Sequence, residues 1–400
     1  MKEYDIIIIG GGVVGCMTAR ALSRYDLKVL LIERESDIGM GASSANSAIV
    51  HAGHDPVPGT LKAEMNRLAN PMWDQISQEL GIPFRRSGAY IVAIDEHEFG
   101  CLTPLKDRAQ RNGVVAEIIS AEEMRKREPL VNPETTGALF TPSAGMVDPF
   151  AACVASIENA IANGVDVLTD TEFTGFILDG RKIRGIHTNR SDFGCRWVIN
   201  AAGTYSDQVM HTAEVRKEFK ITPRRGEYYL LDKSEIAMNN ILFPVPSEVS
   251  KGILVLGSTH GNVLVGPNSQ QTTDKENKAV TPEGLNEIWQ GAQKLVPSIS
   301  PRMIIAVFAG LRASGNAACL NPDVDYSHDF VIETAREISG LINLAGIESP
   351  GLTAAPAIAH RVSELLQESG EKLTEKKCWN PIRSPRPRFN HLSRSEQAAL

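Results

Sequence analysis

The sequence predicts an α/β fold that opens with a Rossmann-type dinucleotide-binding unit, and three observations lead to this prediction. Residues 4–9 form an unbroken run rich in isoleucine, which is typical of a parallel strand buried on both faces. Residues 14–24 then show a helical pattern, and residues 28–33 show a second strand pattern. Together they make a β-α-β unit of about the 30 residues that such a crossover takes.

Later segments extend this unit and add a second kind of sheet. Residues 151–163 and 353–367 show helical patterns, and residues 196–201 and 341–345 are typical of buried strands in the same sheet. The stretch 220–267, by contrast, has the period-two alternation and the turn residues of antiparallel strands. We therefore expect a second, separate antiparallel sheet.

The length of the chain predicts two domains. Its 400 residues, 42% of them hydrophobic, exceed what one compact core usually accommodates. We expect a discontinuous dinucleotide-binding domain, a substrate-binding domain built on the antiparallel sheet, and a polar, proline-broken surface tail or linker. The predicted boundaries are 1–86, 146–215 and 306–370 for the first domain, 87–145 and 216–305 for the second, and 371–400 for the tail.

Charge and composition exclude several function classes. The net charge of −7 comes without a long basic run, which argues against nucleic acid as a partner and favours small molecules. The six cysteines are scattered singly, so we expect reduced thiols in a cytoplasmic protein and no metal site. No stretch approaches the roughly 20 apolar residues of a transmembrane helix. Met1 is expected to be the mature start, because no leader pattern follows it.

A glycine fingerprint stands between the first strand and the first helix. Gly10 permits the tight turn, Gly12 lets the backbone approach a pyrophosphate, and Gly15 lets the helix pack closely on the strand. The helix N-terminus offers N–H groups and partial positive charge to the phosphates. Glu33 ends the second strand, where a carboxylate accepts hydrogen bonds from a ribose 2′-hydroxyl. The fingerprint therefore predicts a dinucleotide with an unphosphorylated ribose, without deciding between FAD and NAD.

The loop at 41–47 favours FAD. It is small, polar and rich in hydroxyl and backbone donors, which suits the wrapping of a long dinucleotide, and a simple nicotinamide site rarely needs such a loop. Its predicted cofactor-binding residues are Ser43, Ser44, Asn46 and Ser47.

From this loop onward the sequence resembles the D-amino-acid-oxidase-like superfamily of FAD enzymes. Within it the chain is most similar to soluble glycerol-3-phosphate dehydrogenases or oxidases and to L-2-hydroxyglutarate oxidases. The stretches that carry the resemblance span nearly the whole chain and are 46–53, 55–63, 200–203, 225–228, 266–268 and 346–353. The resemblance implies a Rossmann-type FAD-binding domain, a substrate domain of the D-amino-acid-oxidase type, and FAD bound without a covalent link.

The resemblance also assigns residues to the flavin. Gly351, Leu352 and Thr353 are expected to offer backbone N–H groups to the pyrimidine end of the flavin at a helix start. This is physically sensible, because reduced flavin carries negative charge there and a helix N-terminus stabilises anions. The predicted cofactor set is completed by Phe173, Ala202 and Gly203.

The same resemblance supplies the expected catalytic and substrate-binding residues. His51 matches the active-site histidine of the family, and a histidine can take a hydroxyl proton while hydride leaves the adjacent carbon. His54 matches no family position and is expected to be peripheral. Arg312 matches an arginine that holds the substrate anion, and a guanidinium fork suits phosphate or carboxylate. With Ser349 it forms the predicted anion site.

One departure from the family leaves the phosphate specificity open. Some glycerol-3-phosphate oxidases have a lysine near the position of Thr259 and His260, and this chain has none there. The leading hypothesis is oxidation of sn-glycerol 3-phosphate to dihydroxyacetone phosphate, with L-2-hydroxyglutarate oxidation as the runner-up. A third hypothesis is an FAD-binding subunit that only transfers electrons.

The sequence leaves the electron acceptor open between oxygen, a quinone and an iron–sulfur partner. Longer relatives carry a cysteine-rich [2Fe–2S] domain after a segment similar to 385–389 and 392–393, so the chain resembles a trimmed form of such a protein. The expected location is the cytoplasm, either free in it or peripheral to the inner membrane. The oligomeric state does not follow from the sequence.

Overall fold

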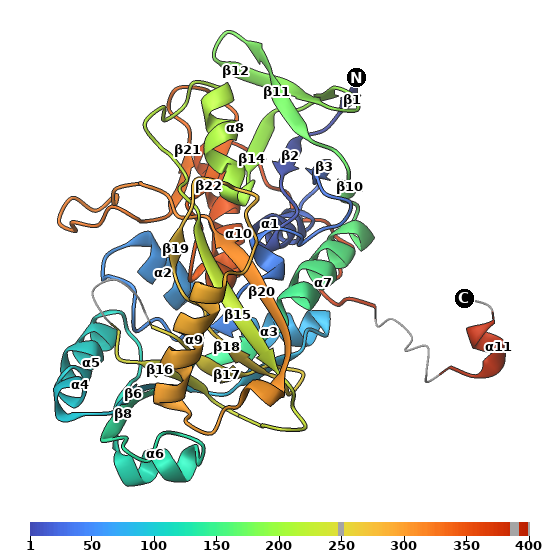
Figure 1. The fold of residues 1–400 in the computed structure, drawn as a ribbon. Coiled ribbons are helices and arrows are strands. Elements are labelled where there is room, and N and C mark those ends of the chain that lie inside the picture. The colour runs from blue at the N-terminus through green and yellow to red at the C-terminus, as the bar shows by residue number, and fades with distance from the viewer. Residues whose placement is uncertain (247–251, 385–391, 399–400) are drawn as a thin grey trace.

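The computed structural model describes residues 1–246, 252–384 and 392–398. Figure 1 shows a parallel sheet with its helices in the upper half and a larger sheet in the lower half, with long strands β15 and β20 running between them. Segments far apart in the chain meet in both halves. The predicted α/β class is confirmed.

The upper sheet has six strands in the order β10-β3-β2-β14-β22-β21. All neighbours pair in parallel except β21, which is antiparallel to β22. Strands β2, β3, β14 and β22 are buried at every residue, as their unbroken apolar runs predict. Their bounds are β2 Ile6–Ile9, β3 Val29–Ile32, β10 Asp166–Leu168, β14 Trp197–Asn200, β21 Val331–Thr334 and β22 Leu341–Ala345.

Helices cover both faces of this sheet. On one face α1 packs between α7 and α10, and α10 in turn packs on α2 and α3. On the other face α8 packs with the strand residues Val198 and Leu341. The bounds are α1 Val13–Leu22, α2 Leu61–Ala69, α3 Met72–Leu80, α7 Pro149–Ala162, α8 Ser206–Thr212 and α10 Gly351–Glu368.

The lower sheet has nine strands in the order β19-β15-β18-β17-β16-β6-β8-β7, with β20 paired to β15. The sequence predicted an antiparallel sheet, and one pair corrects that expectation. Strands β6 and β16 are parallel, because the chain runs through several other elements between them. The bounds are β6 Ala89–Ala93, β7 Glu117–Ser120, β8 Gly137–Thr141, β15 Arg224–Leu231, β16 Ile241–Pro244, β17 Val255–Gly257, β18 Val263–Val265, β19 Gln270–Gln271 and β20 Ile304–Arg312.

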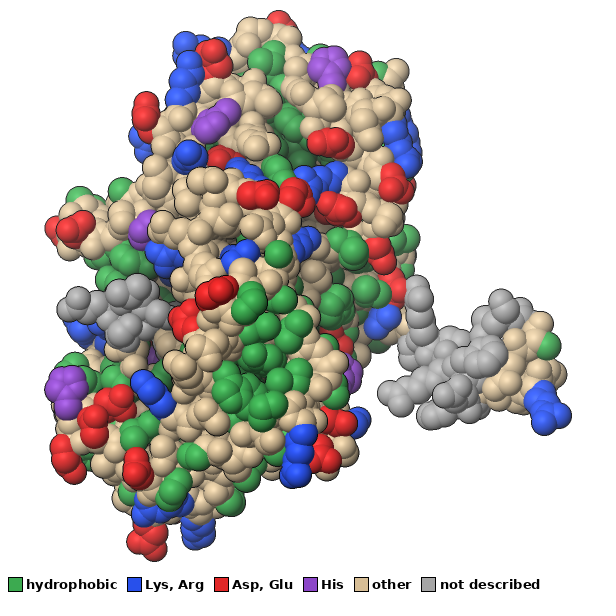
Figure 2. Space-filling view, viewed as in Figure 1, with side chains coloured by type: hydrophobic (Ala, Val, Ile, Leu, Met, Phe, Trp, Pro, Cys, Tyr) green, Lys and Arg blue, Asp and Glu red, His purple; other side chains and the backbone are tan. Residues whose placement is uncertain are grey.

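The two faces of the lower sheet have separate cores. Residues of α9, Pro282–Leu295, and α6, Ala121–Arg127, are buried with one face, and residues of α5, Leu102–Arg111, with the other. Figure 2 shows hydrophobic side chains gathered on the viewed face where β20 lies. On that strand Ile305 is 53% and Val307 is 40% exposed.

Two small sheets and some short helices complete the fold. The sheet β4-β9-β5 matters for the site, because β4 ends one residue before His51. The second sheet is β1-β13-β12-β11. The remaining bounds are β1 Lys2–Glu3, β4 Ile49–Val50, β5 Phe84–Arg86, β9 Gly145–Val147, β11 Phe173–Asp179, β12 Lys182–Thr188, β13 Phe193–Gly194, α4 Glu96–Gly100, α11 Arg394–Gln397, η1 Ala42–Ser44, η2 Gly203–Tyr205 and η3 Pro301–Met303.

The predicted domain boundaries stay a prediction, although two details bear on them. Strand β20 pairs with β15 in the lower sheet, whereas the prediction placed residues from 306 onward in the dinucleotide-binding domain. The first part of the predicted tail lies against the upper half: Trp379 Nε1 donates to Ser23 Oγ at 3.2 Å, and Arg383 Nε donates to Glu158 at 2.6 Å. Residues 385–389, part of the segment that resembles longer relatives, lie outside the described residues.

Candidate functional site

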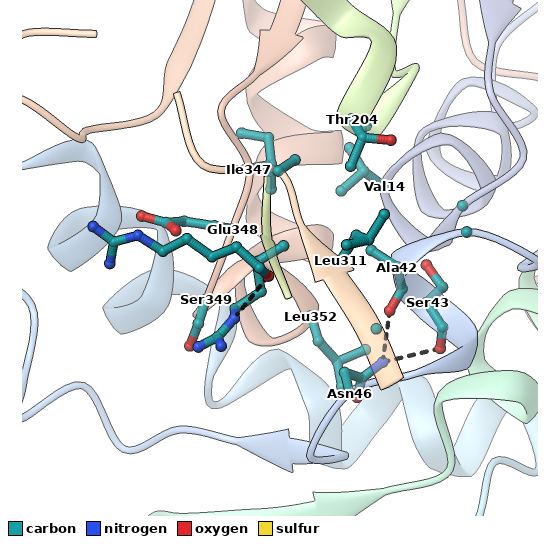
Figure 3. A pocket seen from close by; sticks show the side chains of 18 of the residues that line it. Val14, Ala42, Ser43, Asn46, Thr204, Leu311, Ile347, Glu348, Ser349 and Leu352 are labelled. Atoms are coloured by element: carbon teal, nitrogen blue, oxygen red, sulfur yellow. Dashed lines mark hydrogen bonds between the residues drawn. The ribbon is translucent and has the colours of Figure 1, made fainter. Parts of the chain in front are cut away.

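A cavity of about 1000 Å³ lies between the two large sheets. This is the upper end of the usual range for ligand pockets, so it has room for a long cofactor and a small substrate together. Figure 3 shows side chains from both halves of the chain around it. The predicted site residues that line it are Gly10, Gly12, Glu33, Ser43, Asn46, Ser47, His51, Phe173, Ala202, Gly203, Arg312, Ser349, Gly351 and Leu352.

The glycine turn leaves no room for side chains. Gly10 has φ +107°, and a Cβ there would lie 2.5 Å from the carbonyl oxygen of Ala201. A Cβ on Gly15 would collide with the carbonyl oxygen of Gly10, so Gly15 brings the helix onto the turn. Helix α1 begins after Gly12, which has no side chain to cap it, and the first helical residues, Val13 and Val14, line the cavity.

Glu33 is held in place by the backbone on both sides. One carboxylate oxygen accepts from the Gly11 N–H at 2.6 Å, and the other accepts from the Glu35 N–H at 3.0 Å. Each oxygen keeps a further lone pair, so the carboxylate can still accept from a ligand hydroxyl in the cavity.

The loop at 41–47 uses its polar side chains largely on itself. Ser43 Oγ accepts from the N–H of Val13 at 2.9 Å, which joins the loop to the start of α1. Asn46 Nδ2 donates to the carbonyl oxygens of Ala42 and Ser43 (Figure 3), and its Oδ1 accepts from the Ala48 N–H. These hydrogen bonds within the protein hold the loop in a fixed conformation before any ligand binds.

Three predicted cofactor residues do not line the cavity: Gly15, Ser44 and Thr353. Ser44 Oγ donates to the carbonyl oxygen of Gly41 at 2.8 Å. Thr353 is fully buried, and its Oγ1 accepts from the His51 N–H at 2.9 Å and donates to the carbonyl oxygen of Ile49 at 3.2 Å. Its side chain therefore positions the backbone of His51.

Four hydrogen bonds fix the surroundings of His51. Besides Thr353, the side-chain amides of Asn66 and Asn70 donate to its carbonyl oxygen at 3.2 and 2.9 Å. Its Nε2 lies 3.5 Å from Ser349 Oγ. Ser349 precedes Pro350, the residue just before α10. The imidazole is thus held at the cavity next to the N-terminus of α10, whose first residues Gly351 and Leu352 also line it.

Arg312 ends β20 and points its charge at the cavity. Its Nη2 donates to the carbonyl oxygen of Asn268 at 2.6 Å and its Nε to that of Arg224 at 3.5 Å. Within the described residues its guanidinium forms no ion pair. The carbonyl oxygens of Asn268 and Arg224 therefore orient the Arg312 guanidinium, which has no acidic partner among the described residues.

The polar side chains of the cavity that the sequence analysis did not predict include Arg224, Tyr228, Lys62 and Glu348. Lys62 Nζ and Glu348 form a buried ion pair at 2.6 Å, with the side chains 5% and 11% exposed. Burial by itself raises the pKa of Glu348, but Lys62, with help from Arg224, lowers it overall below the usual value. The period-two pattern of β15 is the signal that could have found Arg224 and Tyr228, because both lie on one face.

Tyr228 is buried against the ring of Phe308, with the centroids 4.7 Å apart. Burial raises the pKa of Tyr228, although the charge of Arg312 and the hydroxyl of Ser47 oppose the rise. The hydroxyl oxygens of Tyr228 and Ser47 lie 3.4 Å apart. Tyr228 is therefore a neutral hydrogen-bonding group beside the arginine.

A family match decides what this cavity belongs to. The family described as DAO, FAD dependent oxidoreductase, matches residues 5–365. The chain belongs to this family. Over 399 residues this FAD-dependent oxidoreductase is 39% identical to the glycerol 3-phosphate dehydrogenase of Caloramator mitchellensis. The alignment covers 99% of this chain and 81% of that protein.

Two more relatives agree with this. The L-2-hydroxyglutarate dehydrogenase of Escherichia coli is 27% identical over 398 residues, covering 90% of this chain and 93% of that protein. The structure of dithionite-reduced L-alpha-glycerophosphate oxidase from Mycoplasma pneumoniae with FAD bound matches with a TM-score of 0.86 and 34% identity, covering 96% of this chain and 98% of that one. The predicted resemblance, its fold and the FAD-dependent oxidoreductase class are confirmed.

The residues of this oxidoreductase fit FAD. The tight turn at Gly10 has no room for a Cβ beside the Ala201 backbone, the first residues of α1 line the cavity, and Glu33 keeps lone pairs for a ribose. Gly310 adds to the fit: a Cβ there would collide with Ala45, so its absence lets the cofactor loop rest on β20. The cofactor prediction therefore agrees with both the family and the cavity.

The two other histidines that the sequence analysis named, His54 and His260, lie in different surroundings. His54, expected to be peripheral, is buried and its ring lies 6.0 Å from that of Phe243. His260 does not line the cavity, and its Nε2 lies 2.8 Å from Asp148 Oδ2. In the described part of the chain no helix is long and apolar enough to cross a membrane, and no cluster of three metal-ligating side chains occurs.

Proposed function

We propose that this oxidoreductase converts sn-glycerol 3-phosphate to dihydroxyacetone phosphate. The observation that carries the proposal is the guanidinium of Arg312, which lines the same cavity as His51 and Ser349 and has no acidic partner among the described residues. A half-buried guanidinium without an acidic partner favours an anion, and the substrate phosphate supplies one. Relatives that are 39% and 34% identical carry the names glycerol 3-phosphate dehydrogenase and glycerol 3-phosphate oxidase.

The proposed cofactor contacts divide between the two ends of the cavity. Gly12 and the start of α1 bind the pyrophosphate, and Glu33 accepts from the adenosine ribose. At the other end the start of α10, Gly351 and Leu352, stabilises negative charge at the pyrimidine ring. When bound there, FAD supplies an acceptor for the hydride of the alcohol carbon.

His51 handles the proton in this proposal. Its Nε2 accepts the proton of the C2 hydroxyl while the carbon–hydrogen bond breaks, and a carbonyl forms at C2. The His51 backbone is held by hydrogen bonds to Thr353, Asn66 and Asn70. Because His51 is fixed before the substrate binds, little ordering of the base is needed in the transition state. A base placed in this way typically contributes about 10²–10⁴-fold to the rate.

Arg312 and Ser349 hold the substrate in the proposed mechanism. Arg312 binds the phosphate through the N–H groups that Asn268 and Arg224 leave unused. Ser349, whose Oγ lies 3.5 Å from His51 Nε2, can donate to the substrate oxygen beside the histidine. Binding at the phosphate thereby places the C2 hydroxyl at the base.

L-2-hydroxyglutarate is the second candidate substrate. It is also an anionic secondary alcohol, so the same base and arginine would serve it, and a relative at 27% identity is named for it. The cavity holds a second arginine, Arg224, which could take a second carboxylate. An electron-transfer subunit without its own substrate is the third hypothesis, and a base beside an anion site argues against it.

A panel of substrates under anaerobic conditions separates the three. The FAD-loaded protein is mixed with sn-glycerol 3-phosphate, its enantiomer, L-2-hydroxyglutarate or glycerol, and the loss of flavin absorbance is followed. We expect rapid bleaching by sn-glycerol 3-phosphate alone. Bleaching by L-2-hydroxyglutarate instead would establish the second candidate, and no bleaching by any of them would favour the electron-transfer subunit.

The electron acceptor and the location are part of the proposal. After anaerobic reduction, the protein is exposed to oxygen, to a quinone or to an oxidised iron–sulfur protein, and the rate at which flavin absorbance returns is compared. Rapid return with oxygen would make the protein an oxidase. Return with a quinone only, together with co-sedimentation with vesicles, would place it on the inner membrane surface.

A further inference from the structure

One face of β15 builds the substrate end of the cavity. Side chains two residues apart in a strand share a face, so Arg224, Gly226 and Tyr228 lie together. Arg224 is paired in register with Arg312 of β20. A Cβ on Gly226 would lie 3.0 Å from Arg312 Nη2, so this glycine leaves room for the Arg312 guanidinium to cross the strand.

The guanidinium of Arg224 differs from that of its neighbour in the chain. Arg225, on the opposite face, donates to Asn277 and Gln270 and forms an ion pair with Glu227 at 3.1 Å, so its charge is satisfied within the protein. Arg224 is half-buried and lines the cavity, and in the described part of the chain its guanidinium makes neither a hydrogen bond nor an ion pair.

The nearby acid does not neutralise this end of the cavity. Glu348 is ion-paired with Lys62 at 2.6 Å, so these two charges cancel. Arg224 lies close enough to contribute to the low pKa of Glu348, which places it near this pair. Of these four charged groups, the guanidiniums of Arg224 and Arg312 have no acidic partner among the described residues, and they lie on neighbouring strands and line the same cavity.

We propose that Arg224 is a second anion-binding residue of the substrate site, and that the pair Arg224 and Arg312 selects a doubly charged anion. Two guanidinium forks can contact different oxygens of one phosphate, and two positive charges match its dianion. The Lys62–Glu348 pair positions this end of the cavity without changing its net charge. The inference rests on the proposed function, because it names the ionisation state of the group that Arg312 is proposed to bind.

Anions of fixed charge test the inference without substrate turnover. The FAD-loaded protein and the variants Arg224→Met, Arg224→Lys and Arg302→Met are titrated by calorimetry with sulfate, a dianion, and with nitrate, a monoanion. Arg302 is the matched control, because its side chain is 75% exposed and does not line the cavity. Flavin content and melting temperature report whether each variant is folded.

We expect the wild-type protein and Arg302→Met to bind sulfate more tightly than nitrate. Arg224→Met should weaken sulfate binding by about 10- to 100-fold, the range for one hydrogen bond to a charged group, and nitrate binding by less than about threefold. Arg224→Lys should recover part of the loss. Equal weakening of both anions, or no weakening of either, would overturn the selection of a dianion by Arg224.

Inorganic phosphate gives a second, independent measurement. Its charge changes from −1 to −2 as the pH rises, so wild-type affinity should increase between about pH 5.5 and 8. In Arg224→Met this increase should be much smaller, and an unchanged increase would contradict the proposal. If Arg224→Met does not fold, Arg224→Gln is measured in its place. The bleaching panel decides the proposed function separately, since anion selectivity can hold whichever alcohol is oxidised.

Discussion

The two ends of the cavity are built in different ways. At the cofactor end the proposed pyrophosphate and ribose contacts lie between Gly10 and Glu33, and they are a glycine turn, a helix start and a side-chain carboxylate held by two backbone N–H groups. At the substrate end they are side chains from distant segments; His51 and Ser349, for example, are 298 residues apart in the chain. The cofactor end therefore depends on space, and the substrate end on charge and on correct assembly.

The largest effect should come from filling the glycine turn. In Gly15→Ala the added Cβ collides with the carbonyl oxygen of Gly10, so the turn or the helix must move away from the cofactor. We expect purified protein without bound FAD, measured by visible absorbance. Gly100→Ala is the control, because no heavy atom lies within 4 Å of its new Cβ and Gly100 does not line the cavity, so this variant should keep full FAD. Full FAD in Gly15→Ala would show that the turn relaxes.

Removal of the base should slow the chemistry without touching the cofactor end. His51→Ala should keep its FAD and reduce it about 10²–10⁴-fold more slowly with substrate, because the hydroxyl proton loses its acceptor. The wild-type rate should rise with pH as the imidazole loses its proton, and the variant should lack that rise. Stopped-flow absorbance across pH measures both. A wild-type rate in the variant would mean that another group or water takes the proton.

Breaking the buried ion pair should lower stability. Glu348→Gln leaves Lys62 buried without its partner, a change that typically costs about 3–5 kcal/mol. The folded pKa of Glu348 is depressed, so its stabilising effect is present above the unfolded value of about 4.5 and is lost as the pH falls through the folded value. Urea unfolding at several pH values measures this. Glu368→Gln, which removes a 58% exposed partner of Arg361, should change stability by less than about 1 kcal/mol.

The smallest effect is expected at the ribose. Glu33→Gln keeps the shape and one acceptor oxygen but loses the charge and one of the two backbone hydrogen bonds. FAD affinity of the stripped protein should fall by about tenfold, or 1.4 kcal/mol, in a fluorescence titration. Reduction of the bound flavin by substrate should not change. A slower reduction at saturating FAD would show that the two ends of the cavity are coupled.

Sequence reasoning worked best where the signal was local. The opening β-α-β unit, the glycine turn and Glu33 lie in one short stretch, and the structure has them as the pattern predicts. The sequence did not predict the strand pairs that join distant segments of the chain. The parallel pair β6 and β16 and the pairing of β20 with β15 depend on how the chain returns to the lower sheet, which no local alternation records.

Some residues of the candidate site were predicted from the sequence, and others were found only in the structure. Family resemblance supplied His51, Arg312 and Ser349, and the structure brings all three to one cavity, while their predicted roles stay predictions. Thr353 was expected at the flavin through its backbone N–H, which stays a prediction, and the structure adds that its side chain holds the His51 backbone. Arg224 was missed, because an arginine in a strand is ordinary until its partners are known.

The sequence by itself determined the α/β class, the dinucleotide turn and the negative net charge, since these depend on hydrophobic periodicity, glycine conformations and charge counts. Only the tertiary structure decided which charges are satisfied. Arg224 and Arg225 are adjacent and chemically identical, yet β15 turns Arg225 toward Glu227, whereas Arg224 lines the cavity and has no ion-pair partner in the described part of the chain. The reason is physical: the free energy of a charge in a protein depends on its neighbours and its access to water, and folding alone sets both.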